Sequence, residues 1–374
     1  MSEPNVTLTG DNTTGERGQT QRVWIRMALS YTLAITCLVW VFHDYDFRSL
    51  RTLLTSMNVP LMAMAIICDV LSFVCQGLRW RLLLRPFGSI TVLRAMQAIY
   101  SGMFVNEVLP MKLGELLRAY LISRWTSVKL GTVATSIVIE RLFDGIWLAA
   151  AFVVTMIYIP LPRRLIEAGD ALSALVLILI SLLIVLSLRR PSLQAFVTGA
   201  HVGDVRVIRH GSSEGGERKR KPVEWSLARS LGALLDRTTV ELRAILHTPS
   251  SLSAFALSLL IVSLQWSAFW LAILAFGLPL SPLTVAAVFV IVHVGTSMPG
   301  APANIGTYQF FTVLGLTLFG VDKTSAAGFS LVVFVLLSAH IWVLGFWALH
   351  RSGLTLLGMR AELSKPLPSL KTND

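Results

Sequence analysis

Charged residues are scarce in this sequence. Only 14% of the 374 residues are Asp, Glu, Lys or Arg, whereas 54% are hydrophobic and the mean hydropathy is +0.67. A water-soluble fold of this size could not bury so much apolar surface and stay dispersed. The scarcity of charge therefore excludes a water-soluble globular protein and predicts that a lipid bilayer surrounds the chain.

Cysteine is also rare, with three residues in the whole chain. Cys37, Cys68 and Cys75 lie in apolar stretches and form no C-x-x-C pair, so we expect neither a disulfide nor a metal site. The sequence lacks the phosphate-binding loop G-x-x-x-x-G-K-[ST], so ATP is not expected to drive the protein directly. No cofactor and no soluble catalytic domain are expected.

Positive charge exceeds negative charge, with 32 Lys and Arg against 21 Asp and Glu. These cations gather in short loops and at the ends of apolar segments, where they orient membrane helices and contact anionic headgroups. We therefore expect membrane lipids as partners and no nucleic acid.

About eight hydrophobic segments predict an all-α polytopic bundle of transmembrane helices, some broken or re-entrant, with added interfacial helices. Charge-free runs such as Ala171–Leu188 and Leu252–Gly277 are long enough to cross about 30 Å of hydrocarbon. Between Thr91 and Arg141 the chain is expected to cross twice, or to dip in and return. The other expected segments are Val23–Phe42, Val59–Gly77, Gly145–Pro160, Leu283–Ser297, Ile305–Phe319 and Ser325–Leu349.

The segments define one membrane domain, residues 23–351. The polar residues 1–22 are expected to be disordered, and residues 352–374 to form a tail. Both ends are predicted to be cytoplasmic because arginines precede the first segment and the basic loop 189–226 requires the inner face.

Amphipathic and aromatic patterns add detail at the segment ends. Asp46–Met57 and Leu227–Leu246 have apolar residues on one helical face, so each is expected to lie as a helix against the membrane or the bundle. Trp80, with the arginines around it, is expected to anchor the second segment at the inner face. Those arginines are Arg79, Arg81 and Arg85.

The first of three polar clusters runs from Asn106 to Arg118. Charges inside membrane segments are costly unless they face a partner, a cavity or water, so such residues are functional candidates. Pro110 is expected to end a helix, and Gly114 to let the chain turn. Glu115 and Arg118, three residues apart, should share a helical face, while a plain capping loop is the alternative. The cluster also contains Glu107 and Lys112.

The second cluster is Glu140, Arg141 and Asp144, placed by the hydropathy pattern at the mouth of a span. Two carboxylates and one guanidinium within a helical turn predict an ion-pair network. This network could bind a zwitterionic or anionic headgroup, because arginine grips phosphate and carboxylates receive an amine. The alternative is a structural clamp to Arg118 or Lys112.

The third cluster, Met298–Gln309, is free of charge and broken by Pro299, Gly300 and Gly306. Such a pattern is typical of a re-entrant hairpin, and a helix starting near Gly306 would present free amides to a phosphate. A bare turn is the alternative. The steps Pro110–Gly114 and Pro302–Gly306 share the pattern P-x-x-x-G, as inverted repeats of a transporter would.

Two further sets of polar residues are weaker candidates. Asp44 and Asp46 form a D-x-D in the first outer loop, where some membrane glycosyltransferases hold a catalytic acid. His293 and His340 lie alone in apolar spans, where helix–helix hydrogen bonding is the commoner role and proton transfer the alternative.

The three clusters resemble one known family. The run N-E-x-L-P-x-K-x-G-E-x-x-R-x-Y from Asn106, the E-R-x-x-D from Glu140 and the run from Pro299 to Gln309 are similar to the lysylphosphatidylglycerol synthase transmembrane region, also called the flippase-like domain. The resemblance spans about Val23 to Arg351. It implies a bacterial or archaeal membrane protein that moves or hands over amphipathic lipids. The glutamate that the family often has near the end of the third motif is Gln309 here.

We therefore expect a lipid translocase of the inner membrane, with a polar groove for a phospholipid or isoprenoid-linked headgroup. A membrane-embedded transferase using Asp44, Asp46 or Glu115 is one alternative. A non-catalytic subunit that presents lipid to a separate lipid-modifying enzyme is another. The candidate substrate-binding residues are Asn106, Glu107, Pro110, Gly114, Glu115, Arg118, Glu140, Arg141, Asp144, Pro299, Gly300, Gly306 and Gln309.

Overall fold

The described part of the chain is helical throughout. The computed structural model describes residues 13–46, 48–109, 112–159, 239–297 and 302–353, with a few isolated positions between 167 and 181. Ten α-helices and one 3₁₀ helix lie wholly within these residues, residues 239–246 are helical as well, and no strand occurs among them. The predicted all-α class is confirmed. The segment Ala171–Leu188, most of Leu227–Leu246, the loop 189–226 and the tail from 354 lie outside the description.

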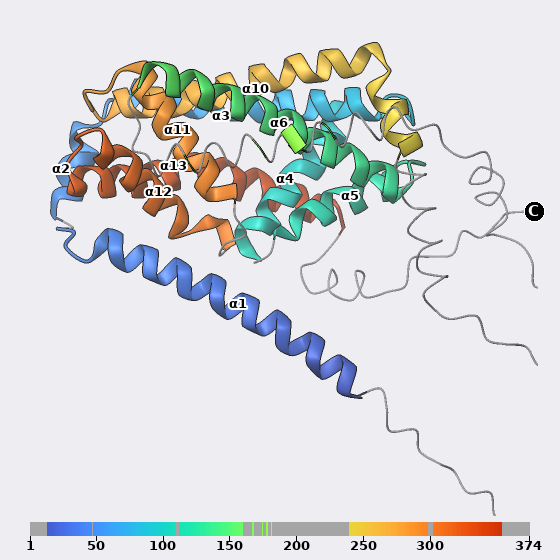
Figure 1. The fold of residues 1–374 in the computed structure, drawn as a ribbon, viewed down its shortest axis with the longest axis horizontal. Coiled ribbons are helices and arrows are strands. Elements are labelled where there is room, and N and C mark those ends of the chain that lie inside the picture. Colours follow the sequence, from blue (N-terminus) through green and yellow to red (C-terminus); the bar gives the residue numbers. More distant parts are fainter. Residues whose placement is uncertain are drawn as a thin grey trace, which may run out of the picture.

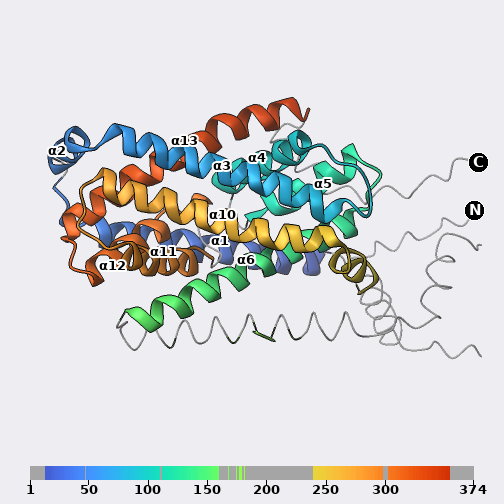
Figure 2. The same ribbon diagram turned by 90° about the horizontal axis from the view of Figure 1, so that it is seen from above.

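Three helices are long and apolar enough to cross a membrane among the described residues: α3 (Val59–Leu84), α10 (Pro249–Ala275) and α13 (Lys323–Arg351). α3 and α10 run side by side along the top of the bundle in Figure 1 and remain adjacent in Figure 2. They are antiparallel, because the amide of Asn58 before α3 donates to the carbonyl of Ala275 at the end of α10, at 2.8 Å.

Polar side chains fix where two of these helices begin. The side chain of Asn58 accepts from the amide of Leu61 at 3.2 Å, and Pro60 occupies the first turn of α3, where its missing amide is harmless. Asp322 accepts from the amide of Ser325 at 3.0 Å and caps α13. Each cap replaces a hydrogen bond that the first helical turn cannot make internally.

The N-terminal helix α1 (Thr13–Phe42) starts earlier than the hydropathy pattern predicts. The expected disordered segment ends at residue 22, yet the helix already includes residues 13–22. Adding polar residues to an existing apolar helix costs little, since the expensive step is nucleation. α1 lies diagonally below the bundle in Figure 1 and contacts it through α12 near its C-terminal end.

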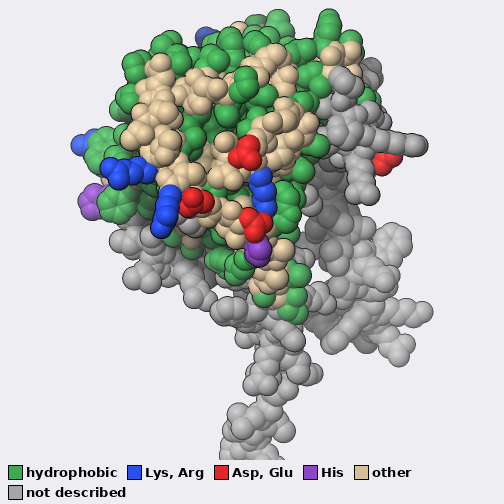
Figure 3. All heavy atoms as spheres, turned by 90° about the vertical axis from the view of Figure 1, so that its left-hand side faces the viewer, with side chains coloured by type: hydrophobic (Ala, Val, Ile, Leu, Met, Phe, Trp, Pro, Cys, Tyr) green, Lys and Arg blue, Asp and Glu red, His purple; other side chains and the backbone are tan. Residues whose placement is uncertain are grey.

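The short amphipathic helix predicted after the first segment is present as α2 (Arg48–Ser56). Asp46 starts it, because its Oδ1 accepts from the amide of Arg48 at 2.9 Å and its carbonyl accepts from Ser49. Asp46 of the D-x-D therefore has a structural role. Figure 3 views this end of the bundle, where a few charged side chains stand among hydrophobic and uncharged ones.

Two pairs of shorter helices are broken hairpins, as the clusters predicted. The first is α4 (Val92–Val108) with α5 (Gly114–Trp125), and the second is α11 (Pro282–Ser297) with α12 (Thr307–Leu318), joined through the 3₁₀ helix η2 (Pro302–Asn304). Within each pair the helices pack against each other.

The two hairpins enter the bundle from opposite ends (Figure 1). α4 starts and α5 ends at the end where α3 finishes, and a guanidinium nitrogen of Arg94 donates to the carbonyl of Trp125 there. α11 starts where α10 finishes, and α12 ends just before α13 begins. The breaks therefore meet inside the bundle, and α4 contacts η2.

Each hairpin contributes to its own apolar core. One core surrounds the buried Trp80, Ile99 and Leu117 of α3, α4 and α5. The other joins residues of α10, α12 and α13 around Phe269 and Phe329. The continuous helices α3 and α13 contribute to both cores, so they tie the two halves together.

Two residues of the predicted interfacial anchor, Arg79 and Trp80, are buried inside the bundle, which corrects the prediction for these two side chains. α3 continues to Leu84, and these two side chains are 2% and 0% exposed. The indole nitrogen of Trp80 donates to Ser136 on α6 (Leu130–Tyr158) at 3.0 Å. The hydropathy pattern did not predict this burial, because a charged residue interrupts an apolar segment whether its side chain is buried or exposed to water.

Candidate functional site

Six charged side chains from three helices form one continuous ion-pair network, called the charge network below. It contains three arginines and three carboxylates, so their formal charges cancel. Its members are Arg79 of α3, Glu115 and Arg118 of α5, and Glu140, Arg141 and Asp144 of α6.

Glu140 is the buried centre of the charge network. Its side chain is 1% exposed, and its Oε2 accepts from Nη2 of Arg118 at 2.5 Å. Its Oε1 lies 3.7 Å from Nε of Arg79, an ion-pair distance longer than a hydrogen bond. Two arginines thus compensate one carboxylate away from water.

Arg79 links this centre to the neighbouring helices. Its guanidinium binds the carboxylate of Asp144 through both terminal nitrogens, one of which also donates to Oγ of Ser258 on α10 at 2.8 Å. Ser258 is completely buried. The forked donor set of arginine suits such a bidentate contact.

The other end of the charge network is accessible. The side chain of Arg141 is 54% exposed, and those of Glu115 and Asp144 are 28% exposed. Nη2 of Arg141 donates to Glu115 at 2.9 Å, while its Nη1 lies 3.6 Å from Asp144. Only this end can meet a ligand without unfolding the centre.

Helical spacing produces this arrangement. Glu115 and Arg118 share a face of α5 as predicted, with 2.8 Å between Oε2 and Nε. On α6 the three charged residues fall within five positions, and Asp144 lies one turn after both Glu140 and Arg141, so it is close to each of them. They lie in the middle third of α6, because this helix begins at Leu130 and not at Gly145 as the hydropathy pattern predicted.

The structural clamp to Arg118, the alternative interpretation of the second cluster, is present through Glu140. Headgroup binding stays a prediction. Lys112 makes a different contact, because its ammonium donates to the carbonyls of Thr296 and Ser297 at 3.2 Å each. These carbonyls end α11, where a cation is favourable. Lys112, in the connection between α4 and α5, therefore joins this connection to the end of α11.

Lys112 lies between the helices in a left-handed backbone conformation, with φ of 53°. The neighbouring Pro110, assigned to end the helix, lies outside the described residues. α4 itself ends at Val108.

Asn106 and Gly114 shape the first break. The amide of Gly114 donates to Oδ1 of Asn106 at 2.8 Å, so a side chain of α4 caps α5. A Cβ on Gly114 would come within 1.8 Å of the carbonyl oxygen of Gly102, so the two backbones approach more closely than any side chain allows. These residues hold the hairpin that carries Glu115.

The third cluster is partly described. Pro299 and Gly300 lie outside the description, whereas Gly306 and Gln309 begin α12. Oε1 of the buried Gln309 accepts from the amide of Gly306 at 2.7 Å, so this amide is occupied and not free as predicted. Gly306 has φ of 85°, and a Cβ there would lie 2.3 Å from the carbonyl of Ala34 on α1.

Glu107 lies apart from the charge network. Its Oε2 accepts from the indole nitrogen of Trp342 on α13 at 3.0 Å. Nδ1 of His293 contacts the carbonyl of Phe289 on its own helix at 3.0 Å. Each residue therefore has a local partner, and neither joins the six charged side chains.

Sequence reasoning missed Arg79 and its partner Ser258. A signal was present: Ser72, Cys75, Arg79 and Leu83 follow the i, i+3, i+7 and i+11 spacing of one helical face, and all four are buried. Arg79 continues this inward face, whereas Arg81 points elsewhere and is exposed.

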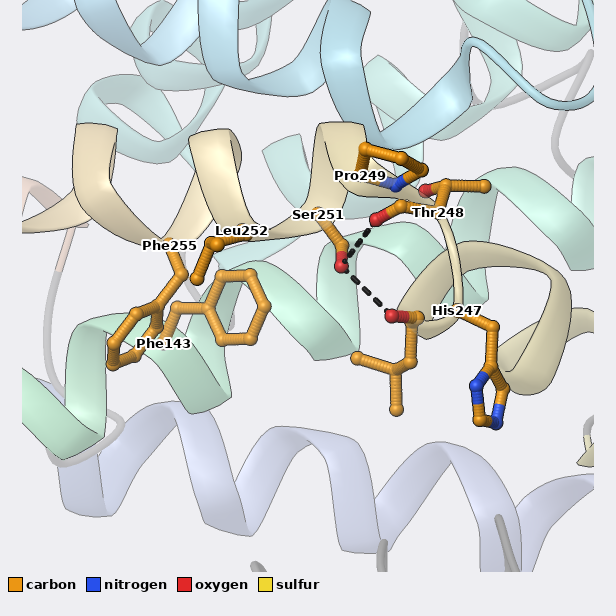
Figure 4. Close-up of a pocket in the computed structure, with 8 residues that line it drawn as sticks. Phe143, His247, Thr248, Pro249, Ser251, Leu252 and Phe255 are labelled. Atoms are coloured by element: carbon orange, nitrogen blue, oxygen red, sulfur yellow. Dashed lines mark hydrogen bonds between the residues drawn. The ribbon is translucent and has the colours of Figure 1, made fainter.

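A separate surface pocket of about 640 Å³ lies where the chain enters α10 (Figure 4). Phe143 and Phe255 form an apolar wall. The hydroxyl of Ser251 is held by the carbonyls of Leu246 and Thr248, at 2.8 and 3.0 Å. No member of the charge network lines this pocket, whose polar lining comes from His247, Thr248 and Ser251.

The geometry defines an all-α membrane bundle with a charge-balanced polar centre that opens at one end. The chain belongs to the family described as the lysylphosphatidylglycerol synthase TM region, whose model matches residues 23–346. The resemblance noted in the sequence is thereby confirmed, and a membrane protein of lipid-related function follows. No curated protein matches the chain.

Proposed function

We propose that the protein is a lipid translocase that carries a phospholipid or isoprenoid-linked headgroup past the hydrocarbon core. The observation that carries this proposal is the charge network, which runs from a buried centre to an accessible end inside an apolar bundle. A headgroup needs such a polar path because charged groups are costly in hydrocarbon.

In this mechanism the headgroup exchanges partners with the accessible end. A phosphate would take the guanidinium of Arg141, whose Nη2 donates to Glu115 at 2.9 Å in this structure. The released carboxylates of Glu115 and Asp144 could then receive an amine or hydroxyl group of the same lipid. Arg79 and Arg118 stay bound to Glu140, so α3, α5 and α6 keep their positions.

The proposed setting is the bacterial inner membrane with both termini in the cytoplasm. The supporting features are the family and the distribution of cations along the sequence. Movement would be downhill or coupled to an ion.

Transport by purified protein in liposomes tests the proposal. Labelled phospholipid or isoprenoid lipid should move between leaflets, and Arg141→Ala should slow this movement about 10- to 100-fold, the loss expected for one charge-assisted contact. Arg81→Ala, an exposed arginine of α3 outside the charge network, is the matched control and should transport normally. Equal transport by wild type, Arg141→Ala and Glu115→Gln would contradict the mechanism.

The same preparation separates the alternatives. Turnover of a donor sugar would establish a transferase, for which Glu115 or Asp44 would be the candidate acid. Lipid binding with neither transport nor turnover, restored to function by a second enzyme, would establish a lipid-presenting subunit.

A further inference from the structure

A second polar pair lies between α3 and α13, away from the charge network. Oδ2 of Asp69 is 3.7 Å from Nε2 of His340, and their side chains are 16% and 9% exposed. Each residue lies well inside a helix that is long and apolar enough to cross a membrane. On α3, Asp69 precedes Arg79 by ten positions, about 15 Å along the helix axis.

Aromatic rings hold the imidazole of His340 in place. Its centroid lies 5.1 Å from Phe73 and 5.9 Å from Tyr100, edge-on to both. These two rings are themselves stacked at 5.1 Å, and both side chains are buried. Edge-to-face contacts of this kind restrict the ring, so its Nε2 remains directed toward α3.

The other ionisable groups near the pair are few. Tyr100 of α4 and Tyr308 of α12 interact electrostatically with Asp69, as does its neighbour Cys68. α10, which packs along α3, contains no ionisable side chain. Among the described residues no Lys or Arg forms an ion pair with Asp69, so His340 is its only potential cation there.

The charge of the pair depends on one proton. A carboxylate beside a neutral imidazole carries one negative charge, which is costly in an apolar segment. Adding a proton makes the pair neutral overall, either as a carboxylic acid with imidazole or as a carboxylate with imidazolium. The low-dielectric surroundings therefore favour the protonated pair, whereas contact with water favours release.

We propose that Asp69 and His340 form a proton-binding site that couples proton movement to lipid transport. The coupling part rests on the proposed function, whereas proton binding does not. A proton from water is taken up by the carboxylate or the imidazole and later returned to water, with no other bond changed. α3 connects this site to the charge network, because it carries both Asp69 and Arg79.

Infrared difference spectra of the protein in vesicles, recorded as pH changes, test proton binding directly. Uptake by the pair should change either the carboxyl C=O band of Asp69 or the ring bands of His340. Asp69→Asn and His340→Gln should each remove the signal. His350→Gln, at the exposed end of the same helix, should keep it. A spectrum unchanged by Asp69→Asn and His340→Gln would overturn the site.

Steady-state lipid distribution in the same vesicles tests coupling. For each proton coupled per lipid, a gradient of one pH unit should shift the ratio of lipid between leaflets by up to about tenfold. Asp69→Asn and His340→Gln should still exchange lipid but show no such shift. A full shift in both variants, or none in the wild type, would overturn coupling. Wild-type vesicles that titrate yet move no lipid would instead contradict the proposed function and leave the proton site standing.

Discussion

At the scale of single residues, Glu140 has the most demanding position in the structure. Its side chain is 1% exposed and lies between the guanidinium groups of Arg79 and Arg118. Burying one carboxylate is tolerable only because two cations share its charge. Removing it leaves cationic side chains in the core without their shared partner.

We predict that Glu140→Ala lowers the free energy of unfolding by about 3–5 kcal/mol, the cost of breaking a buried ion pair from one side. Arg141→Ala should cost less than about 1 kcal/mol, because that side chain is 54% exposed and its contacts are screened by water. Thermal and denaturant unfolding of the detergent-solubilised variants measures both. If both variants lost the same free energy of unfolding, the buried centre and the accessible end of the charge network would not differ in stability as the structure indicates.

Some of these residues were identifiable from sequence and others were not. Three charged residues interrupt apolar stretches: Glu115, Arg118 and Glu140. Because charge is costly in hydrocarbon, the sequence predicted them as functional candidates. Arg79 was read as an anchor because a basic run follows it, and its inward direction depends on the packing of α6 and α10. Asp69 received no role because its partner His340 is distant in sequence.

At the scale of helices, the close approach inside the first hairpin sets the position of the charge network. Gly102 of α4 and Gly114 of α5 meet backbone to backbone, and Glu115 follows directly. A side chain at this contact must push the two helices apart, because the atom it meets is a carbonyl oxygen and cannot rotate away.

We predict that Gly114→Ala destabilises the protein by about 1–3 kcal/mol, the range typical of overpacking. The same substitution should weaken the contact between Glu115 and Arg141. Gly88→Ala is the matched control, because the nearest atom to its Cβ would be a methyl of Val128 at 3.2 Å. Comparing thermal stability and lipid transport checks this, and a Gly114→Ala protein as stable as wild type would show that the contact is looser.

The helix boundaries show which segment ends the hydropathy pattern predicts correctly and which it does not. Leu283–Ser297 and Ile305–Phe319 were predicted nearly as observed in α11 and α12, because Pro and Gly mark their ends. The helical break after Val108 was predicted for the same reason. The continuation of α3 past Gly77 was not, because its last turns are stabilised by buried contacts that composition does not record.

At the scale of the whole molecule, the two broken hairpins point toward each other from opposite ends. This agrees with the opposed arrangement expected from the two P-x-x-x-G steps. Lys112, between α4 and α5, connects the two hairpins by donating to the carbonyls of Thr296 and Ser297. Opposed hairpins meeting in the interior are typical of transporters whose binding site lies near the bilayer midplane.

We predict that the start of α4 and the start of α11 face opposite sides of the membrane. In a variant without native cysteines, Arg85→Cys before α4 should react with an impermeant thiol reagent only from the cytoplasmic side. Ser281→Cys before α11 should react only from the other side. Both positions are exposed. Labelling of intact and opened cells measures this, and reaction of both from one side would contradict the opposed arrangement.

The cancellation of charge within the network has an electrical consequence. Moving one elementary charge across 100 mV of membrane potential is worth about 2.3 kcal/mol. Three arginines and three carboxylates that shift together do no such work. A shift of the whole charge network would therefore be independent of the voltage, whereas a separation of Arg141 from Glu115 would not. Any current recorded during such a shift would then be the sum of the headgroup charge and the charge of any coupled proton.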